Sequence, residues 1–192
     1  SLSVTSGSVL DLSVITMTGT NALTLNGTGI SSGGALTNSS TTAATYAGAI
    51  TLGTAPSVGG SSGDITLSGI ISGSAGMTKI GSSTLTLSGA NTYTGGTTIN
   101  GGILSISSDG NLGGVPGSTT ASAITLNGGA LQASGDVTVD SKRGITLTAA
   151  SGLAATSSNT LTYGGIVTGA YALTINGASE TGTVFLSGAN TY

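Results

Sequence analysis

A six-residue segment, SGANTY, occurs twice in the chain, and this recurrence constrains the fold more than any other feature of the sequence. The first copy spans 88–93 and the second spans 187–192, which is 99 positions later. Other short segments recur at similar offsets, because LTLNG at 23–27 corresponds to ITLNG at 124–128. Self-similarity at a long period is the signature of repeat architectures. We therefore expect one continuous segment over 1–192, made of nearly two units of about 100 residues. The predicted units are about 1–101 and 102–192.

Within each unit, short runs place two large apolar residues on either side of one threonine. This alternation has the two-residue period of a β-strand, in which successive side chains point to opposite faces. In TLTL at 84–87, Leu85 and Leu87 are expected to point inward and the threonines outward, and ITL at 124–126 and at 145–147 repeats the pattern. Leu and Ile suit an interior, whereas β-branched Thr suits the solvent side of a strand. The sequence therefore predicts an all-β protein.

Asn-Gly pairs follow four of these predicted strands and mark the turns between them. The pairs are Asn26-Gly27, Asn100-Gly101, Asn127-Gly128 and Asn176-Gly177. Asn-Gly between alternating strands is a strong hairpin signal, so an antiparallel sandwich is one interpretation. A turn at the same place in each repeat favours instead a parallel β-solenoid, whose corners stack coil upon coil. About 20 to 25 residues per coil would give roughly eight or nine coils.

The composition excludes several classes of function. Charged residues are only 5% of the chain, against about 25% in an ordinary soluble domain. With no His and no Cys, ordinary transition-metal sites and Ser-His or Cys-His nucleophiles are excluded. Three basic residues make no stripe for nucleic acid, and no apolar run reaches the roughly 18 residues of a membrane-spanning helix. We expect no cofactor, no metal, no nucleic-acid partner and no membrane insertion. The missing initiator Met indicates an internal piece of a longer chain.

The stretch GMTKIGSSTLTLSGANTYTGGTTINGGIL at 76–104 resembles the passenger-associated transport repeat, also called the autotransporter-associated β-strand repeat, of bacterial type V secretion. A partial copy, TGTVFLSGANTY at 181–192, has Phe185 where the middle Thr is usual. The repeat-motif residues that we take as the candidate site are Lys79, Gly81, Leu85, Leu87, Gly89, Asn91, Tyr93, Gly95, Ile99 and Gly102.

This resemblance implies a right-handed parallel β-helix from the passenger of a cell-surface autotransporter, located outside the bacterial outer membrane. It implies a non-enzymatic structural and adhesive stalk, an outer-membrane translocator in the parent protein, and repeats that support export and folding. The expected partner is a host or neighbouring-cell surface, the matrix, or another copy of the chain. An unfolded chain that threads a pore benefits from the lack of disulfides, and local coil-on-coil contacts let folding propagate from one end.

Two other functions remain open on the sequence. The segment DVTVDSKR at 136–143 gathers Asp136, Asp140, Lys142 and Arg143, which could form the cleft of a polysaccharide-binding or -cleaving β-helix. On one strand the two carboxylates would lie about 13 Å apart, beyond the roughly 5 to 9.5 Å of paired glycosidase carboxylates, so a solvated loop is favoured. The second alternative is a self-assembling extracellular fibre or sheath subunit, formed through exposed sheet edges.

The aromatic residues and threonines raise two lesser possibilities. The tyrosines are Tyr46, Tyr93, Tyr163, Tyr171 and Tyr192, and any of them could stack on sugars. Tyr93 and Tyr192 recur with the motif, so packing at strand or coil corners is favoured for these two. Outward rows of threonine could order water at an ice surface, but the irregular strand spacing of the sequence disfavours this function.

Overall fold

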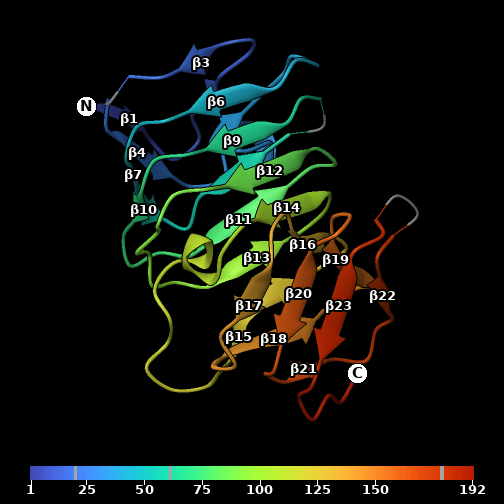
Figure 1. The fold of residues 1–192 in the computed structure, drawn as a ribbon. Coiled ribbons are helices and arrows are strands. Elements are labelled where there is room, and N and C mark those ends of the chain that lie inside the picture. Colours follow the sequence, from blue (N-terminus) through green and yellow to red (C-terminus); the bar gives the residue numbers. More distant parts are fainter. Residues whose placement is uncertain (20, 61, 178–179) are drawn as a thin grey trace.

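The computed structural model of the chain describes residues 1–19, 21–60, 62–177 and 180–192 and contains almost only β-strands and turns. Every pairing between its named strands is parallel, from β1 with β4 near the N-terminus to β20 with β23 near the C-terminus. Hairpins would give antiparallel pairs, so the antiparallel sandwich is wrong. The predicted parallel β-solenoid is confirmed (Figure 1).

The strands form four sheets. Sheet I contains β1 (Leu2–Val4), β4 (Leu23–Asn26), β7 (Ile50–Thr54) and β10 (Ile71–Ser72). Sheet II contains β2 (Leu10–Asp11), β5 (Leu36–Thr37), β8 (Ser57–Gly59), β11 (Met77–Ile80), β13 (Thr97–Ile99), β15 (Thr120–Leu126), β18 (Arg143–Leu147) and β21 (Val167–Thr168). Sheet III contains β3 (Thr16–Met17), β6 (Ala44–Tyr46), β9 (Ile65–Leu67), β12 (Thr84–Leu87), β14 (Ile103–Ile106), β16 (Ala130–Ala133), β19 (Ser151–Ala155) and β22 (Leu173–Ile175). Sheet IV contains β17 (Val137–Val139), β20 (Thr160–Tyr163) and β23 (Thr183–Leu186), and two 3₁₀ turns are η1 (Ile30–Ser32) and η2 (Asp109–Leu112).

Each coil adds one strand to sheet II and one to sheet III, and both sheets therefore have eight strands. The coils differ in length. Leu85 pairs with Leu104, 19 positions later, whereas Leu104 pairs with Leu131, 27 positions later. The longer coil carries η2 and the loop that follows it, which hangs from the lower left of the solenoid in Figure 1. Coil length therefore varies because residues are inserted at a corner. The strands of sheets II and III still pair with those of the neighbouring coils.

The alternating Leu-Thr-Leu pattern produces the strands as expected. Leu85 and Leu87 are fully buried while Thr86 between them is half-buried on the outside. Ile124 and Leu126 flank Thr125 in the same way. These inward side chains stack on those of the neighbouring coils and form one continuous apolar core. Burial of each large aliphatic side chain contributes roughly 1.5 to 3 kcal/mol.

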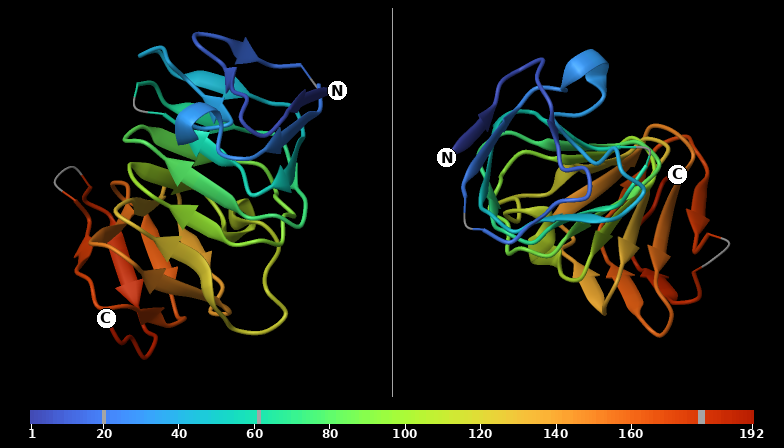
Figure 2. Two further views of the ribbon diagram at one scale, coloured as in Figure 1. Left: turned by 180° about the vertical axis from the view of Figure 1, so that it is seen from behind. Right: turned by 90° about the horizontal axis from the view of Figure 1, so that it is seen from above.

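The third face of the solenoid is interrupted in the middle of the chain. Sheet I covers this face in the first four coils and sheet IV covers it in the last three, but the two sheets do not join. Between them lie the 88–96 segment and η2. Figure 2 shows that the last coils are shifted sideways relative to the first. The interruption therefore coincides with the SGANTY segment, and side chains replace strand pairing there.

Candidate functional site

The apolar members of the repeat motif line the core of two successive coils. The motif at 76–104 supplies β11, β12, β13 and the first residues of β14. Leu85, Leu87 and Ile99 are each fully buried. Leu85 pairs in register with Ile65 of the coil before and Leu104 of the coil after, which continues an unbroken apolar stack. These three candidate residues are therefore packing residues.

Lys79 is a buried cation in an otherwise apolar stack. It pairs in register with Val58 and Ile99, which are both buried hydrophobic residues. Its Nζ donates to the carbonyl oxygens of Ile80 at 2.8 Å, Gly81 at 3.0 Å and Gly101 at 3.2 Å. Burial lowers the pKa of Lys79 to about 8, and the Asp64 carboxylate opposes this shift. The ammonium thus joins the corner of its own coil to the corner of the next.

Four glycines of the motif lie where a neighbouring backbone leaves no room for a side chain. Gly81 has φ +73°, and a Cβ there would overlap the carbonyl of Gly60. Gly102 has φ +59°, and a Cβ there would lie within 2.7 Å of the Gly81 oxygen. Gly89 and Gly95 are each blocked by the backbone of the preceding coil. Their small size allows coil-on-coil contact at the corners.

Two buried asparagines replace strand pairing on the interrupted face. The Asn91 side-chain oxygen accepts the N–H of Ile71 at 2.8 Å, and its Nδ2 donates to the carbonyl of Asn111 at 2.7 Å. The Asn111 side chain in turn donates to the carbonyl of Gly89 at 2.9 Å and accepts the N–H of Ser108 at 2.9 Å. The two amides therefore connect three successive coils. The bonds to Ile71, to the carbonyl of Asn111 and to Gly89 are buried, so they satisfy polar groups that have no access to bulk water.

Tyr93 lies in the core beside these amides. Its side chain is fully buried, and its hydroxyl and that of Thr97 share a hydrogen bond of 2.8 Å. Burial raises the pKa of Tyr93 to about 12. Tyr163 is buried in the same way and donates to the carbonyl of Arg143 at 2.7 Å. The packing role expected for Tyr93 is confirmed, and Tyr46 and Tyr163 have the same character.

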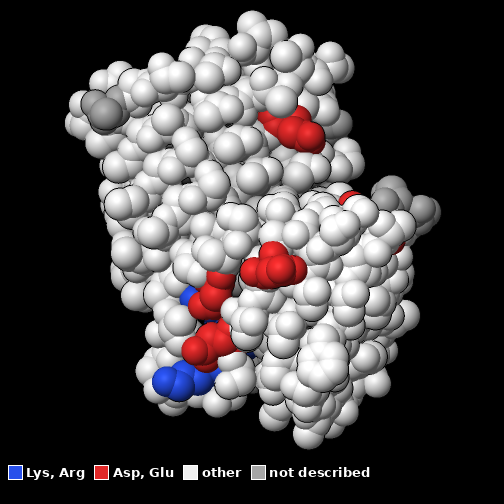
Figure 3. Space-filling view, in the orientation of Figure 1, with Lys and Arg blue, Asp and Glu red and all other residues white. Residues whose placement is uncertain are grey.

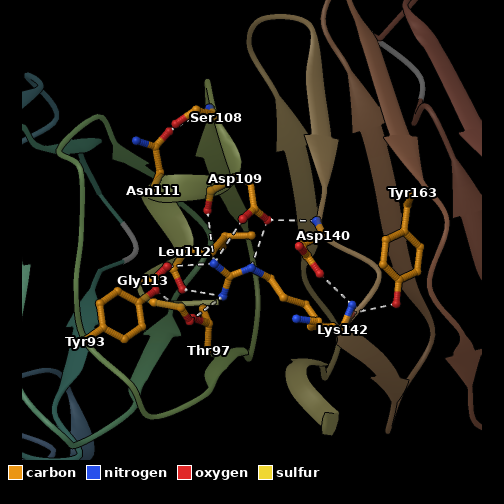
Figure 4. A network of polar contacts seen from close by, with 12 residues as sticks. Tyr93, Thr97, Ser108, Asp109, Asn111, Leu112, Gly113, Asp140, Lys142 and Tyr163 are labelled. Atoms are coloured by element: carbon orange, nitrogen blue, oxygen red, sulfur yellow. Dashed lines mark hydrogen bonds and ion pairs between the residues drawn. The ribbon is translucent and has the colours of Figure 1, made fainter. Parts of the chain in front are cut away.

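An ion pair that local sequence does not reveal completes the site. The Arg143 Nε donates to Asp109 Oδ1 at 2.9 Å, and both groups lie in the interior, with side-chain exposures of 4% and 19%. The remaining guanidinium hydrogens reach the carbonyls of Leu112 at 3.1 Å, Gly113 at 2.7 Å and Gly114 at 3.2 Å. Figure 4 shows Asp109, Leu112 and Gly113 on one side of this network and Lys142 on the other. Arg143 therefore anchors η2 and the start of the loop after it to the following coil.

The charged side chains of the segment at 136–143 bind different partners in the fold. Arg143 turns inward to Asp109, and the Asp140 carboxylate accepts the backbone N–H of Lys142 at 2.8 Å. Asp136 accepts the N–H of Thr160 in the next coil at 2.8 Å. The expectation of a solvated loop is correct for Lys142, which is exposed, but wrong for Arg143, which is 3% exposed. Burial of Arg143 is possible because a carboxylate and three carbonyls surround its guanidinium.

The other acidic residues also bind across coils. Asp11 accepts the N–H of Ser39 at 3.0 Å, and hydrogen bonding to Ser39 lowers the pKa of this carboxyl. Asp64 accepts the N–H of Thr84 at 2.7 Å, and Glu180 accepts the Gln132 amide at 2.6 Å. In Figure 3 most of the surface is uncharged, and the few charged side chains lie mainly in one cluster of both signs on the lower half of the molecule. Most of the charge of the chain thus serves to join coils.

Three features of the described residues concern possible metal ligands, buried polar groups and membrane-spanning helices. Among residues 1–19, 21–60, 62–177 and 180–192, no three His, Cys, Asp or Glu side chains come close enough to hold a metal ion. Within the same ranges, every buried side-chain nitrogen or oxygen has a hydrogen-bond partner. No helix in the described part of the chain has the length and apolarity needed to cross a membrane.

The second SGANTY copy repeats the backbone contacts of the first. The Asn190 side-chain oxygen accepts the N–H of Val167 at 2.9 Å, as Asn91 accepts that of Ile71. Tyr192 differs from Tyr93 because half of it is exposed in this structure, and the packing expected for Tyr192 stays a prediction. Phe185 faces outward, in register with Thr162, and is 55% exposed.

A parallel β-solenoid whose motif residues all serve coil packing belongs to the class of structural repeat proteins. The family model described as passenger-associated-transport-repeat matches residues 77–106 and 178–192. The chain is 41% identical over 104 residues to a protein named adhesin BmaC autotransporter from Brucella suis biovar 1 (strain 1330). The match covers 54% of this chain and 3% of that protein. No solved structure matches significantly.

These findings show that the chain carries two matches to the passenger-associated transport repeat and is similar over about half of its length to a small part of an autotransporter adhesin. Autotransporter passengers are secreted to the cell surface, which agrees with the extracellular location expected from the sequence.

Proposed function

We propose that the segment is a non-enzymatic structural stalk of an adhesive passenger, and that its transport repeats support export and folding. The observation that carries this proposal is the use of the motif side chains. Lys79, Asn91 and Tyr93 all contact backbone or side chains in the interior, and none presents a reactive group to solvent. A motif devoted to packing supports a structural function better than a catalytic one.

The position of the hydrogen bonds made by the motif supports the export role. Asn91 and Asn111 join three successive coils at the face where sheets I and IV are interrupted. In a solenoid, each coil is stabilised mainly by its neighbours, so a strong link between coils lets order propagate along the chain. A segment that orders on the outside of the membrane resists sliding back through the export pore. The parent protein is then expected to contain an outer-membrane translocator.

The adhesive role rests on the relative named as an adhesin, and its partner would be a host or neighbouring-cell surface or the matrix. Asp136 and Asp140 each accept a backbone N–H, from Thr160 and Lys142 respectively, which supports a structural use of these two carboxylates. A stalk of this kind presents its sides and its distal region to the partner.

A surface-display experiment tests the proposal. The segment is fused to a signal peptide and an outer-membrane translocator, and surface exposure is measured by antibody binding to intact cells, relative to total protein. Replacing Asn91 and Tyr93 by Ala is expected to lower the displayed fraction several-fold. The matched control replaces Thr92 and Thr94 by Ala, because these residues alternate with Asn91 and Tyr93 and are exposed, and it is expected to have a smaller effect. Equal display of the first variant and the wild type would contradict the export role.

A further inference from the structure

A small polar cavity lies between the outer side of sheet II and the loop at 113–119. Its volume is about 110 Å³, which is larger than one water molecule needs. Thr94, Thr120 and Ser122, which carry hydroxyl groups, line it together with the backbone of Gly95 and Gly96. These are groups that both donate and accept hydrogen bonds. Pro116, on the loop, adds an apolar surface to the wall.

The loop over this cavity is held firmly at both of its ends. At its start, the Gly114 N–H donates to the carbonyl of Tyr93 at 2.9 Å, and Arg143 binds the carbonyls of Gly113 and Gly114. At its end, the Thr120 N–H donates to the carbonyl of Lys142 at 2.9 Å. Such anchoring shapes the cavity before any ligand arrives and so lowers the entropic cost of binding. Insertions in solenoid coils often form the binding face.

A ladder of threonine hydroxyls continues from the cavity along sheet II. Thr78, Thr98, Thr125, Thr146 and Thr168 are paired in register on successive strands. All five are partly exposed. The Ser122 hydroxyl at the cavity contacts that of Thr146 at 3.3 Å. Because neighbouring strands lie about 4.8 Å apart, a linear polymer along the solenoid axis would meet one hydroxyl per coil.

The one charged residue among the described residues that line the cavity is already paired within the protein, which disfavours ionic ligands. Arg143 lines the cavity, but its guanidinium hydrogens are directed to Asp109 and to carbonyls of the loop. The guanidinium is therefore paired within the protein and offers no free hydrogens to a sulfate, phosphate or uronate group. A ligand for this surface is expected to be uncharged and rich in hydroxyl groups.

We propose that the cavity under the 113–119 loop, with the adjoining threonine ladder of sheet II, is a binding site for a neutral oligosaccharide. One sugar residue sits in the cavity against Pro116 and the hydroxyls of Thr120 and Ser122, and the following sugars lie along the threonines. The proposal identifies a neutral oligosaccharide as the partner in adhesion, and it rests on the adhesive function proposed above. Sugar binding does not depend on the export role.

Titration of the ¹⁵N-labelled chain, followed by amide chemical shifts, tests the site. The neutral probes are the hexasaccharides of cellulose, chitin, xylan, β-mannan and maltodextrin at millimolar concentrations, and the charged comparators are hexagalacturonate and a heparin hexasaccharide. We expect saturable shifts at Gly95, Gly96 and Ser122 with at least one neutral probe. No saturable shift with any neutral probe, or binding of the charged probes alone, would overturn the proposal while leaving the surface-display result unaffected.

Three variants locate the binding. Ser122→Leu fills the cavity from an exposed position and is expected to abolish the shifts. Thr125→Val removes one ladder hydroxyl at nearly constant shape and is expected to weaken binding several-fold. The matched control is Thr66→Val, because Ile65-Thr66-Leu67 on sheet III repeats the sequence Ile124-Thr125-Leu126, and its affinity should equal that of the wild type. Undiminished binding by the Ser122→Leu variant, with wild-type amide shifts elsewhere, would refute the assigned site.

Discussion

Arg143 and Asp109 lie 34 positions apart in the chain and form a buried ion pair of 2.9 Å that ties one coil of the solenoid to the next. Asp109 belongs to η2, in the region where sheets I and IV fail to meet, and Arg143 begins β18 of sheet II. The pair therefore stabilises the part of the solenoid that lacks strand pairing on its third face. It also sets the base of the 113–119 loop, through the carbonyls of Gly113 and Gly114.

Removing the carboxylate should destabilise the fold strongly. Asp109→Ala leaves Arg143 buried without its counter-ion, and breaking such a pair typically costs about 3 to 5 kcal/mol. We expect a loss at the lower end of that range, because Asp109 is 19% exposed. Urea unfolding followed by circular dichroism measures the change. The control Lys142→Ala alters an exposed neighbour and should stay within about 0.5 kcal/mol of the wild type. A loss below about 1 kcal/mol for Asp109→Ala would refute the stabilising role.

The two asparagines of the SGANTY copies should differ in their contribution to stability. Asn91→Ala removes two buried partners, the N–H of Ile71 and the carbonyl of Asn111, and should cost about 3 kcal/mol. Asn190→Ala removes a bond to the N–H of Val167 at a half-buried position and should cost about 1 kcal/mol. Urea midpoints and amide hydrogen exchange at Ile71 and Val167 measure both effects. Equal losses of stability in the two variants would contradict the prediction that the more buried asparagine contributes more.

The two tyrosines of the same motif provide a second matched pair. Tyr93→Ala empties a fully buried site and should cost about 3 to 5 kcal/mol, and Tyr93→Phe, which removes only the bond to Thr97, should cost about 1 kcal/mol. Tyr192→Ala should change little, because that side chain is half exposed. Thermal unfolding compares the three variants. A large loss of stability for Tyr192→Ala together with a small loss for Tyr93→Ala would contradict the packing role given to Tyr93.

Stability should pass through a maximum near pH 10. The pKa of Lys79 is about 8 in the folded chain and 10.5 in the unfolded chain, so the unfolded state binds more protons between these values and stability rises with pH. Tyr93 and Tyr163 have pKa values of about 12 when folded and 10 when unfolded, so stability falls as pH rises above 10.

Urea unfolding at pH 7 to 11.5 measures this profile, with a rise of up to about 3 kcal/mol from the lysine alone. Lys79→Met should remove the rise between pH 8 and 10 and leave the fall above pH 10. A rise that survives in Lys79→Met would assign it to another group.

The strands and the class of fold were predictable from the sequence because they depend on local periodicity. The runs at 84–87, 124–126 and 145–147 form strands with the expected faces, since one residue of shift would bury threonine and expose leucine. The Asn-Gly pairs at 26–27, 100–101, 127–128 and 176–177 follow strands or end them, as expected. Their repetition, rather than their hairpin character, indicated the correct topology.

The network around Arg143 could not be predicted, because it depends on contacts between distant segments. Nothing near Arg143 in the sequence indicates that Asp109 and the carbonyls of Leu112 and Gly113 surround it. The inward orientation of Lys79 could be inferred from the residues at the same position of the neighbouring strands, because Val58 and Ile99 are both apolar. These neighbours can be recognised only when the register between coils is known. The varying coil lengths hide this register in the sequence.

Small-angle X-ray scattering of the purified chain over a concentration series tests the central claim most directly. A stalk segment whose coils are joined internally should scatter as a separate elongated particle of about 18.0 kDa, with a maximum dimension that does not change with concentration. The eight coils of sheets II and III imply a length along the axis of roughly 40 Å before corner loops are added. A mass and dimension that grow with concentration into filaments would contradict the stalk and support a self-assembling fibre.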